Sequence, residues 1–553
     1  MSKNSEYVWL NEPSLQFMKQ DYLESGHSVD DRVTVIGDTA ETILKKSGLS
    51  KKFKEYMKKG WYSLSTPVWT NFGTDRGLPA SCYGTSLIDD CDSIVDAQSE
   101  VSIMSKHGGG TSVYLNRLRE RGALIKNGRN GKTGGPVHFA QAFDTNINIF
   151  SQGSARRGSC AIWLDIGHPD VMEFLAIKSP GNPIQHLSFG VCVSDKWIEE
   201  MKAGHSGKRK VWAKVLESRN SKGYPYIFFT DNVNNNTVDV YRDKGLKIDH
   251  SNLCSETCII DNDLWSFVCF LSSQNILKYD EWKDTDATEV LVYVLDATVT
   301  EFINRARDFK HMQRAVKFAE EQRALGIGWL GWHSYLQSRN IAWESMEAKH
   351  LNVEIAKNIH KACYAASAKM AAEYGEPSLL KGYGRRHVTL QAIAPTKSSS
   401  FILGQVSEGI EPIRANYYIK DLAKGKFTIK NKYLEEILES KDLNNDETWM
   451  SIMKNSGSVQ HLKELSEHEK NVFKTFAEIS PMEIIIQAAQ RQKYIDQSQS
   501  LNLIIDPKTP VKDVNKLILS AWEMGIKTLY YQISVNAAQQ LARGILNCTS
   551  CES

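Results

Sequence analysis

The stretch SNLCSE at residues 251–256 places an amide, a thiol and a carboxylate at alternate positions of the chain. In a strand, Asn252, Cys254 and Glu256 would project from one face, because side-chain direction alternates with a period of two residues. That face would carry a hydrogen-bonding amide, a thiol and a general base close together. We interpret these three side chains as one reactive group.

A second group of thiols lies at the other end of the chain. Cys548 and Cys551 are separated by two residues, close to the last residue, Ser553. Two thiols at this spacing on a tail form a mobile dithiol that can exchange with a disulfide elsewhere. A fixed site that oxidises thiols and a tail that reduces them again would together indicate redox chemistry.

Composition excludes several classes of protein. A hydrophobic content of 41% and a charged content of 24% are typical of a soluble globular protein with a large core. The net charge of +2 argues against a dedicated nucleic-acid binder. The N-terminus lacks the apolar region of a signal peptide, and no apolar run is long enough to predict a membrane span. Ten cysteines are too sparse for a disulfide scaffold and suit a reducing cytoplasm.

Helical periodicity marks two regions. The first 60 residues are predicted to be helical, with Ser28 and Asp31 as a capping box. The stretch from Lys310 to Glu373 is also predicted to be helical, with Asn352 as a cap and one apolar face that continues to Met370. Both regions therefore present an apolar face to a core.

Short β-rich runs occupy the part of the chain between these regions. Examples are Phe189 to Val193 and Tyr226 to Phe229, which alternate with polar and glycine-rich loops. Residues 430–480 are charged and helical in pattern, so we expect a peripheral insertion there. Alternation of strands and helices over most of the chain favours an α/β architecture.

The stretch from Gly326 to Gly331 satisfies the dinucleotide-binding pattern GxGxxG. That pattern carries weight only after a strand and before a helix N-terminus. Here the preceding residues, Lys317 to Ala324, have the pattern of a charged helix. We therefore reject a dinucleotide fold and expect close helix packing around the small residues.

Three polar or aromatic groups each have a functional and an ordinary interpretation. The hydroxyls of Pro395 to Ser400 could hold a phosphate or form a solvated turn. Asp89 and the basic residues from Arg117 to Lys132 could bind a nucleotide or form a solvated surface. Tyr530 and Tyr531 would ordinarily be core or interface aromatics. None of the three is specific by itself.

Taken in order along the chain, these pieces resemble the catalytic (large) subunit of ribonucleotide reductase, class I. The resemblance covers Ser65 to Ser553 and rests on an ordered set of short motifs. These are Ser65-Thr66-Pro67, Ser81-Cys82, Asp89 to Ser93, Ser151 to Gly158, Ser251 to Glu256, Pro395 to Ser400 with Gly409 to Pro412, Leu529-Tyr530-Tyr531 and the terminal cysteines.

The resemblance implies a thiyl radical at Cys254, which would abstract a hydrogen atom from the ribose 3′ carbon. It implies that Glu256 is the general base for the 3′-hydroxyl and that Asn252 hydrogen-bonds the sugar hydroxyls. Cys82 and Cys269 would be the redox pair that finishes as a disulfide. Cys258 is a nearby thiol that competes with Cys269 for this role. Cys548 and Cys551 would then reduce the disulfide by exchange.

The same resemblance implies that Tyr530 and Tyr531 relay an electron and a proton to Cys254. The implied substrate-phosphate residues are Thr66, Ser81, Thr396, Lys397, Ser398, Ser399 and Ser400. The residues implied to bind an effector, a dNTP or ATP, or to transmit its identity are Asp89, Arg119, Gln152 and Arg156. No metal site is expected, and the radical would come from a separate metal-containing (beta) subunit.

The implied fold is a ten-stranded α/β barrel of two half-barrels, with Cys254 on a loop inside it. We expect an N-terminal helical segment at residues 1–64 without an ATP-cone, the barrel at 65–538 and a flexible dithiol tail at 539–553. The implied partners are the beta subunit, thioredoxin or glutaredoxin, a ribonucleoside diphosphate and a second copy of the chain. Nucleic acid and membrane are not expected, and the compartment is the cytoplasm, that of a host if the chain is phage-encoded.

Two alternatives stay open at this point. One is a class II enzyme that forms its radical with adenosylcobalamin and would not need the tyrosine pair. The other is a non-catalytic nucleotide-binding or zinc-binding protein on the same fold. Retention of the catalytic thiols together with Asn252 and Glu256 argues against the second alternative.

Overall fold

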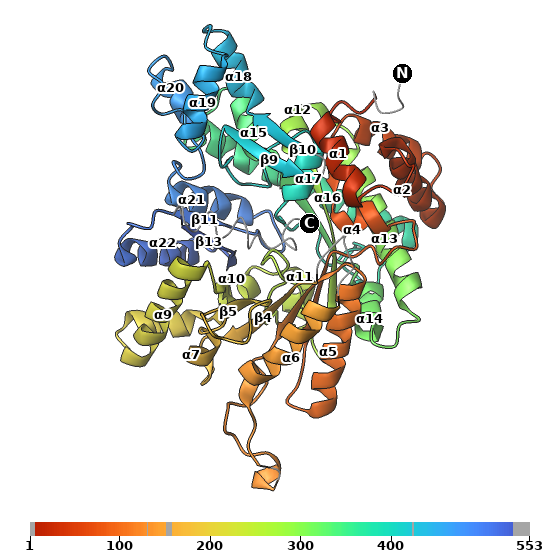
Figure 1. Ribbon diagram of the computed structural model, residues 1–553. Coiled ribbons are helices and arrows are strands. Elements are labelled where there is room, and N and C mark those ends of the chain that lie inside the picture. Colours follow the sequence, from red (N-terminus) through yellow and green to blue (C-terminus); the bar gives the residue numbers. More distant parts are fainter. Residues whose placement is uncertain (1–5, 130, 151–157, 423–424, 535–553) are drawn as a thin grey trace.

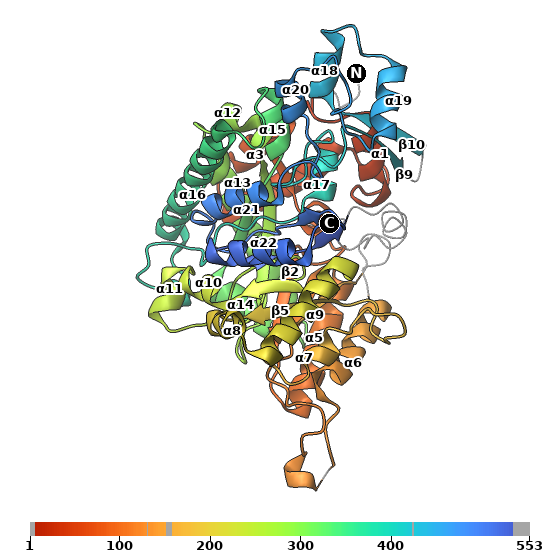
Figure 2. The same ribbon diagram turned by 90° about the vertical axis from the view of Figure 1, so that its left-hand side faces the viewer.

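The computed structural model of the protein describes residues 6–129, 131–150, 158–422 and 425–534 (Figure 1). A β-sheet lies at the centre of the molecule and is surrounded by helices, as Figures 1 and 2 show from two directions. Within the described residues, no helix combines the length and the apolar character needed to cross a membrane.

Five parallel strands form the first half of the barrel. They are hydrogen-bonded to one another in sequence order and are almost entirely buried. Runs of apolar residues such as Tyr226 to Phe229 are typical of a parallel sheet that is covered on both faces. The strands are β2 (Cys82–Ser86), β3 (Gly110–Tyr114), β4 (Cys160–Asp165), β5 (Ser188–Val193) and β6 (Tyr226–Phe229).

The second half-barrel is also parallel but less regular. Strand β7 (Phe267–Asn275) pairs with β8 (Leu325–Leu330). Single bridges from Ile327 to Gln391 and from Ile393 to Gln499 continue the ring. Strand β11 (Leu503–Ile505) then pairs with β13 (Gln532–Ser534), which directly follows β12 (Thr528–Leu529). This half therefore also has five segments, namely β7, β8, residues 391–393, residues 499–505 and residues 528–534.

Two antiparallel contacts join the halves. Strand β2 pairs with β7 at one junction, and β12 pairs with β6 at the other. Five segments from each half close a ring of ten, so the predicted α/β barrel of two half-barrels is confirmed.

Three helices precede the barrel and pack on its side at the upper right of Figure 1. They are α1 (Glu12–Asp21), α2 (Val29–Leu44) and α3 (Leu49–Lys58). The capping box of Ser28 and Asp31 at the start of α2 is confirmed. The short strand β1 (Tyr62–Leu64) pairs with the end of β7 and so already belongs to the main sheet. The boundary between residues 64 and 65 stays a prediction.

The predicted helical region after Lys310 contains more than helices. Helices α14 (Gln313–Gln322), α15 (Trp332–Ser338) and α16 (Met346–Tyr374) are interrupted by β8. The prediction of Asn352 as a cap is wrong, because Ser345 caps α16 by accepting a hydrogen bond from the amide of Ala348. Asn352 lies inside the helix, where its buried amide donates to the carbonyl of Gln487.

The GxGxxG stretch is a buried strand, so the expectation of helix packing around its glycines is wrong. A Cβ atom on Gly326 would lie 2.2 Å from Cδ2 of Leu271, and one on Gly328 would lie 2.8 Å from the carbonyl oxygen of Ala392. The glycines therefore allow β8 to lie close to its neighbours within the barrel.

Residues 417–473 form the lobe at the top of Figure 1. It comprises the hairpin β9 (Tyr417–Leu422) and β10 (Gly425–Lys430) with helices α18 (Lys432–Glu439), α19 (Asp446–Lys454) and α20 (Glu467–Val472). Leu434, Trp449 and Ile452 belong to a hydrophobic cluster separate from the main core. The expected peripheral insertion is therefore present.

The other helices cover the barrel and connect its strands. They are α4 (Thr66–Asn71), α5 (Cys91–Lys106), α6 (Gly135–Ile149), α7 (Val171–Phe174), α8 (Asp195–Lys202), α9 (Ser206–Lys222), α10 (Thr230–Asn235), α11 (Asp239–Asp243), α12 (Tyr279–Trp282), α13 (Ala287–Ala306), α17 (Lys397–Ile402), α21 (Pro481–Gln492) and α22 (Val511–Glu523), with 3-10 turns η1 (Lys126–Gly128), η2 (Ile276–Lys278) and η3 (Ser378–Leu380).

A buried carboxylate on α13 ties this helix to the second half-barrel. Oδ1 of Asp296 lies 2.6 Å from Nε of Arg323, 3.0 Å from Nε of Arg386 and 3.1 Å from Nε2 of His387. Burial alone would raise the pKa of Asp296, but the Arg323 guanidinium and then His387 and Arg386 hold this pKa well below its ordinary value. The cluster therefore holds the carboxylate in its charged form.

We predict that Asp296→Ala lowers the free energy of unfolding by about 3–5 kcal/mol, because it leaves buried guanidinium groups without their counter-charge. The stabilisation from Asp296 is complete above the ordinary carboxyl pKa of about 4 and is lost as the pH falls through the lower folded-state value. Thermal and urea unfolding would measure both effects. Glu523→Gln, which removes an exposed pair with Lys202, is the control and should cost about 1 kcal/mol or less. Equal stability of the two variants would contradict the prediction.

Candidate active site

The stretch at residues 251–256 lies in a loop between α11 and β7, as the family resemblance implied, and not in the strand that the alternating pattern suggested. Ser255 has a φ of 68°, which a regular strand does not allow. Residues of the second half-barrel hold the loop instead. Ser500 Oγ donates to the carbonyl of Cys254 at 2.6 Å, and Thr528 Oγ1 donates to the carbonyl of Ser255 at 2.7 Å. The loop is therefore buried, yet its polar backbone is bonded.

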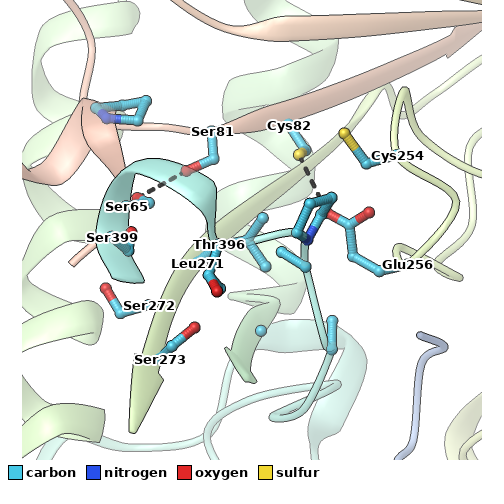
Figure 3. Close-up of a pocket in the computed structure, with 15 residues that line it drawn as sticks. Ser65, Ser81, Cys82, Cys254, Glu256, Leu271, Ser272, Ser273, Thr396 and Ser399 are labelled. Atoms are coloured by element: carbon cyan, nitrogen blue, oxygen red, sulfur yellow. Dashed lines mark hydrogen bonds between the residues drawn. The ribbon is translucent and has the colours of Figure 1, made fainter. Parts of the chain in front are cut away.

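The loop nevertheless brings the predicted reactive group together. Asn252 Nδ2 donates to Sγ of Cys82 at 3.1 Å, and Sγ of Cys82 lies 3.8 Å from Oε1 of Glu256. Cys82, Cys254 and Glu256 line one cavity, and Figure 3 shows their side chains converging at one end of it. A thiol at Cys254 thus shares a small enclosed volume with a carboxylate and a second thiol.

The carboxyl group of Glu256 is buried among hydrogen-bond donors. Burial raises the pKa of Glu256 above its ordinary value, and hydrogen bonds from Asn252, Ser500 and Cys82 oppose that rise. Ser500 Oγ donates to Oε2 of Glu256 at 3.0 Å. A carboxyl group with a raised pKa is suited to accept a proton and to give it back at physiological pH.

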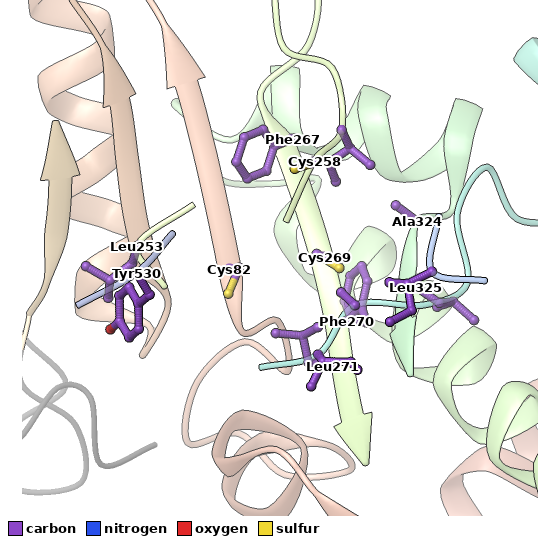
Figure 4. Close-up of a cluster of buried hydrophobic side chains, with 14 of the residues drawn as sticks. Cys82, Leu253, Cys258, Phe267, Cys269, Phe270, Leu271, Ala324, Leu325 and Tyr530 are labelled. Atoms are coloured by element: carbon purple, nitrogen blue, oxygen red, sulfur yellow. The ribbon is translucent and has the colours of Figure 1, made fainter. Parts of the chain in front are cut away.

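Cys82 and Cys269 lie directly opposite each other where β2 pairs with β7. Figure 4 shows the two side chains on these neighbouring strands. Gln497 Nε2 lies 3.6 Å from Sγ of Cys269, and burial raises the pKa of Cys269 to about 12.

Cys258 lies on the buried loop, and its backbone amide donates to Oε1 of Gln497 at 3.1 Å. Burial raises the pKa of its thiol to about 12 as well. Cys82 lines the cavity, whereas neither Cys258 nor Cys269 belongs to its wall.

Hydroxyl groups line the far end of the cavity. Ser81 Oγ donates to Ser65 Oγ at 2.9 Å, and Ser399 Oγ donates to the carbonyl of Leu64 at 3.1 Å. Thr396 also contributes to the wall, and Figure 3 shows Thr396 and Ser399 on the segment that forms α17. The site therefore has a thiol end and a hydroxyl end.

The other predicted phosphate residues surround this end without belonging to the wall. Thr66 Oγ1 lies 2.9 Å from the hydroxyl of Tyr22, and Ser400 Oγ lies 2.7 Å from Oγ1 of Thr396. Lys397 is half-buried and Ser398 is buried at the start of α17. Sequence reasoning missed Ser272 and Ser273, which line the cavity from β7 and carry no motif of their own.

Tyr530 and Tyr531 lie between β12 and β13, with ring centroids 4.3 Å apart. The amide of Tyr530 donates to the carbonyl of Leu501, which fixes this segment in the second half-barrel. Ser500, the neighbour of Leu501, bonds the carbonyl of Cys254, so the tyrosine segment is linked to the reactive loop.

Two further tyrosines, which sequence reasoning missed, complete a cluster. The ring of Tyr226 lies 4.7 Å from that of Tyr530, and the ring of Tyr224 lies 5.1 Å from that of Tyr531. Tyr226 begins β6 and Tyr224 lies just before that strand, about 300 residues earlier in the chain. No local pattern links such distant positions.

The residues predicted to bind an effector lie at the other end of the strands from Cys82. Asp89 follows β2, Arg119 follows β3, and the two side chains form an ion pair. Arg119 also donates to the carbonyl of Leu124 at 2.8 Å. Gln152 and Arg156 lie outside the described residues, and so do Cys548 and Cys551 with the rest of the predicted tail.

Known proteins are similar to this chain. The family described as ribonucleotide reductase, barrel domain, matches residues 80–208, 206–379 and 378–532. A ribonucleoside-diphosphate reductase large subunit of Invertebrate iridescent virus 3 is 32% identical over 561 residues, which cover 87% of each chain. That of Trypanosoma brucei brucei is 27% identical over 583 residues, which cover 89% of this chain and 68% of the relative.

A solved structure is similar over almost the whole chain. It is the class Id ribonucleotide reductase alpha subunit of Actinobacillus ureae, with 47% sequence identity, a TM-score of 0.91 and coverage of 99% of both chains. This similarity is to a class I enzyme, so the class II alternative is not favoured. The chain belongs to the ribonucleotide reductase family, among its large, catalytic subunits.

Proposed function

We propose that this chain reduces ribonucleoside diphosphates to 2′-deoxyribonucleoside diphosphates, with a thiyl radical at Cys254. The observation that carries the proposal is the meeting of Cys82, Cys254 and Glu256 in one cavity whose other end is lined by hydroxyls. The radical would arrive from a separate subunit, as the similarity to class I subunits supports.

The geometry supports distinct roles for the three side chains of the loop. The Cys254 thiyl would take the 3′ hydrogen atom of the ribose, forming an S–H bond and leaving a carbon radical. Glu256 would accept the proton of the 3′-hydroxyl, which its raised pKa favours. Asn252, held by the amide of Thr257 at 3.0 Å, would hydrogen-bond the sugar hydroxyls.

The electrons would come from a pair of thiols. One of them protonates the departing 2′-hydroxyl, water leaves, and two electrons pass to the sugar as the two sulfurs form a disulfide. Cys254 would then return its hydrogen atom to the 3′ carbon, which closes the product and regenerates the thiyl radical. The register of β2 and β7 supports Cys82 and Cys269 as this pair. Cys548 and Cys551 would reduce the disulfide by thiol exchange and be recharged by thioredoxin or glutaredoxin.

We further propose that Thr66, Ser81 and residues 396–400 hold the substrate phosphates, because Ser81, Thr396 and Ser399 line the hydroxyl end of the cavity. Asp89 and Arg119 would contact a dNTP or ATP effector, and Gln152 and Arg156 would pass its identity to the substrate site. A homodimer in a reducing compartment remains part of this proposal.

We predict that Cys254→Ser abolishes CDP reduction and that Tyr531→Phe lowers it at least about a thousandfold. The first variant cannot form a thiyl radical, and the second breaks the transfer of a proton together with an electron. The assay is deoxynucleotide formation with dithiothreitol and a candidate class I radical subunit. Activity of Tyr531→Phe with added adenosylcobalamin would contradict the class I assignment.

We predict that kcat rises with pH through the raised pKa of Glu256, because the carboxylate is the form that accepts the proton. Glu256→Gln should remove this acidic limb and nearly all activity, while CDP still binds. A pH–rate profile and equilibrium binding measure the two effects. A wild-type profile that stays flat as the pH falls to the ordinary glutamate pKa of 4.5 would count against Glu256 as the base.

The competition between Cys269 and Cys258 has a direct test. Cys269→Ser should stop dCDP formation with dithiothreitol, because Cys82 then has no thiol opposite it. Cys258→Ser is the matched buried control and should keep most of the activity. Mass spectrometry after one turnover without reductant should find the disulfide between Cys82 and Cys269. A disulfide between Cys82 and Cys258 would reverse the assignment.

A further inference from the structure

A third tyrosine lies in hydroxyl contact with the tyrosine pair. The hydroxyl oxygens of Tyr224 and Tyr531 are 2.9 Å apart, and their ring planes meet at 73°. This distance is that of a hydrogen bond between two phenols, so one hydroxyl donates to the other. Tyr224 belongs to the segment between α9 and β6, on the opposite half-barrel from Tyr531.

The backbone on both sides of this contact is fixed. Arg219 Nη1 donates to the carbonyl of Pro225 at 2.5 Å and to that of Tyr530 at 3.1 Å, and its guanidinium is buried. The amide of Gln532 donates to the carbonyl of Gly223 at 3.3 Å. The residues on either side of Tyr224 and on either side of Tyr531 are therefore all hydrogen-bonded. These bonds fix the geometry of the contact between the two tyrosines.

The Tyr224 ring is itself held by its surroundings. It stacks on Phe189 with centroids 5.3 Å apart, and its hydroxyl lies 3.3 Å from Oγ of Ser188. Its exposed fraction is 8%. A buried phenol held on one face and bonded through its oxygen has little freedom to turn away from Tyr531.

We propose that Tyr224 is a third redox-active tyrosine, which exchanges a hydrogen atom with Tyr531. In this step the Tyr224 O–H bond breaks and the Tyr531 O–H bond forms, or the reverse. One phenol is oxidised to a phenoxyl radical while the other phenoxyl radical is reduced to a phenol. The proton and the electron move together, so no charge is left in the buried site.

The step rests on the proposed function, since its oxidant is the radical delivered by the separate subunit. Because the same bond type breaks and forms, the transfer between the two phenols is close to balanced in energy. The radical would therefore be shared between Tyr224 and Tyr531 before it moves on through Tyr530. Tyr226 packs against the pair by its ring, whereas Tyr224 makes the hydroxyl contact that carries the proton.

The test is site-specific incorporation of 3-aminotyrosine, which is easier to oxidise than tyrosine and so traps a passing radical. The substituted full chain is mixed with the radical subunit, CDP and an effector, and electron paramagnetic resonance is recorded. We expect an aminotyrosyl radical with the analogue at position 224, formed as the radical of the partner subunit decays. The same analogue at Tyr241, a buried tyrosine bonded to Gln322, should give no signal.

The analogue at position 531 separates this inference from the proposed function. A signal at 531 without one at 224 would overturn the role of Tyr224 and leave the tyrosine relay intact. The absence of a radical signal with the analogue at position 531 would overturn the tyrosine relay itself and, with it, the inference about Tyr224.

Tyr224→Phe supplies a second readout. We expect turnover to fall by up to roughly tenfold, the effect of one lost hydrogen bond, with unchanged thermal unfolding. A residue that only positions Tyr531 would also lower turnover on this substitution. It would not hold a radical, so a silent analogue at 224 in an active enzyme would assign Tyr224 to positioning alone and refute the proposal.

Discussion

The antiparallel contact between β2 and β7 is the constraint on which the site depends. The ring segments run parallel within each half-barrel, and the pairing of β2 with β7 at a junction between the halves is antiparallel, so two thiols face each other there across strands of opposite direction. Cys82 and Cys269 occupy that junction. The chain that connects β6 to β7 must also cross from one half to the other, and it carries Cys254 into the interior as it does so.

A buried loop is unfavourable unless its polar groups are bonded, and this requirement shapes the second half-barrel. Ser498, Ser500 and Thr528 bond the backbone or the side chain of residues 254–256. Thr528 also precedes the tyrosine pair by two residues. The segment that holds the loop is thus the one that carries Tyr530. The position of Cys254 and the position of the tyrosine pair are therefore fixed by the same segment.

The sequence predicted the barrel and the reactive side chains of the site correctly, but it predicted the local backbone around them less well. The ordered motifs pointed to Cys82, Cys254 and Glu256, which do share a cavity. The alternating pattern at 252, 254 and 256 suggested a strand and the family resemblance implied a loop, and bonds from residues 246 and 273 positions away hold that loop. The glycines of β8 were interpreted as sites of close helix packing. That interpretation was wrong because the sequence does not show that Leu271 lies against Gly326. Local signals such as the cap at Ser28 succeed where the partner is three residues away.

Burial also decides what chemistry can connect the surface to Cys254. Tyr530 and Tyr226 are almost completely excluded from solvent, and charged intermediates in such a place would lose most of their hydration. A chain of phenols in ring and hydroxyl contact avoids this cost, because each step moves a neutral hydrogen atom. The nearby guanidinium of Arg219 acts in the same direction, since a buried positive charge raises the energy of a tyrosyl radical cation beside it. Electron transfer without the proton is therefore the disfavoured path, and hydroxyl contacts such as that of Tyr224 with Tyr531 are where the proton can move.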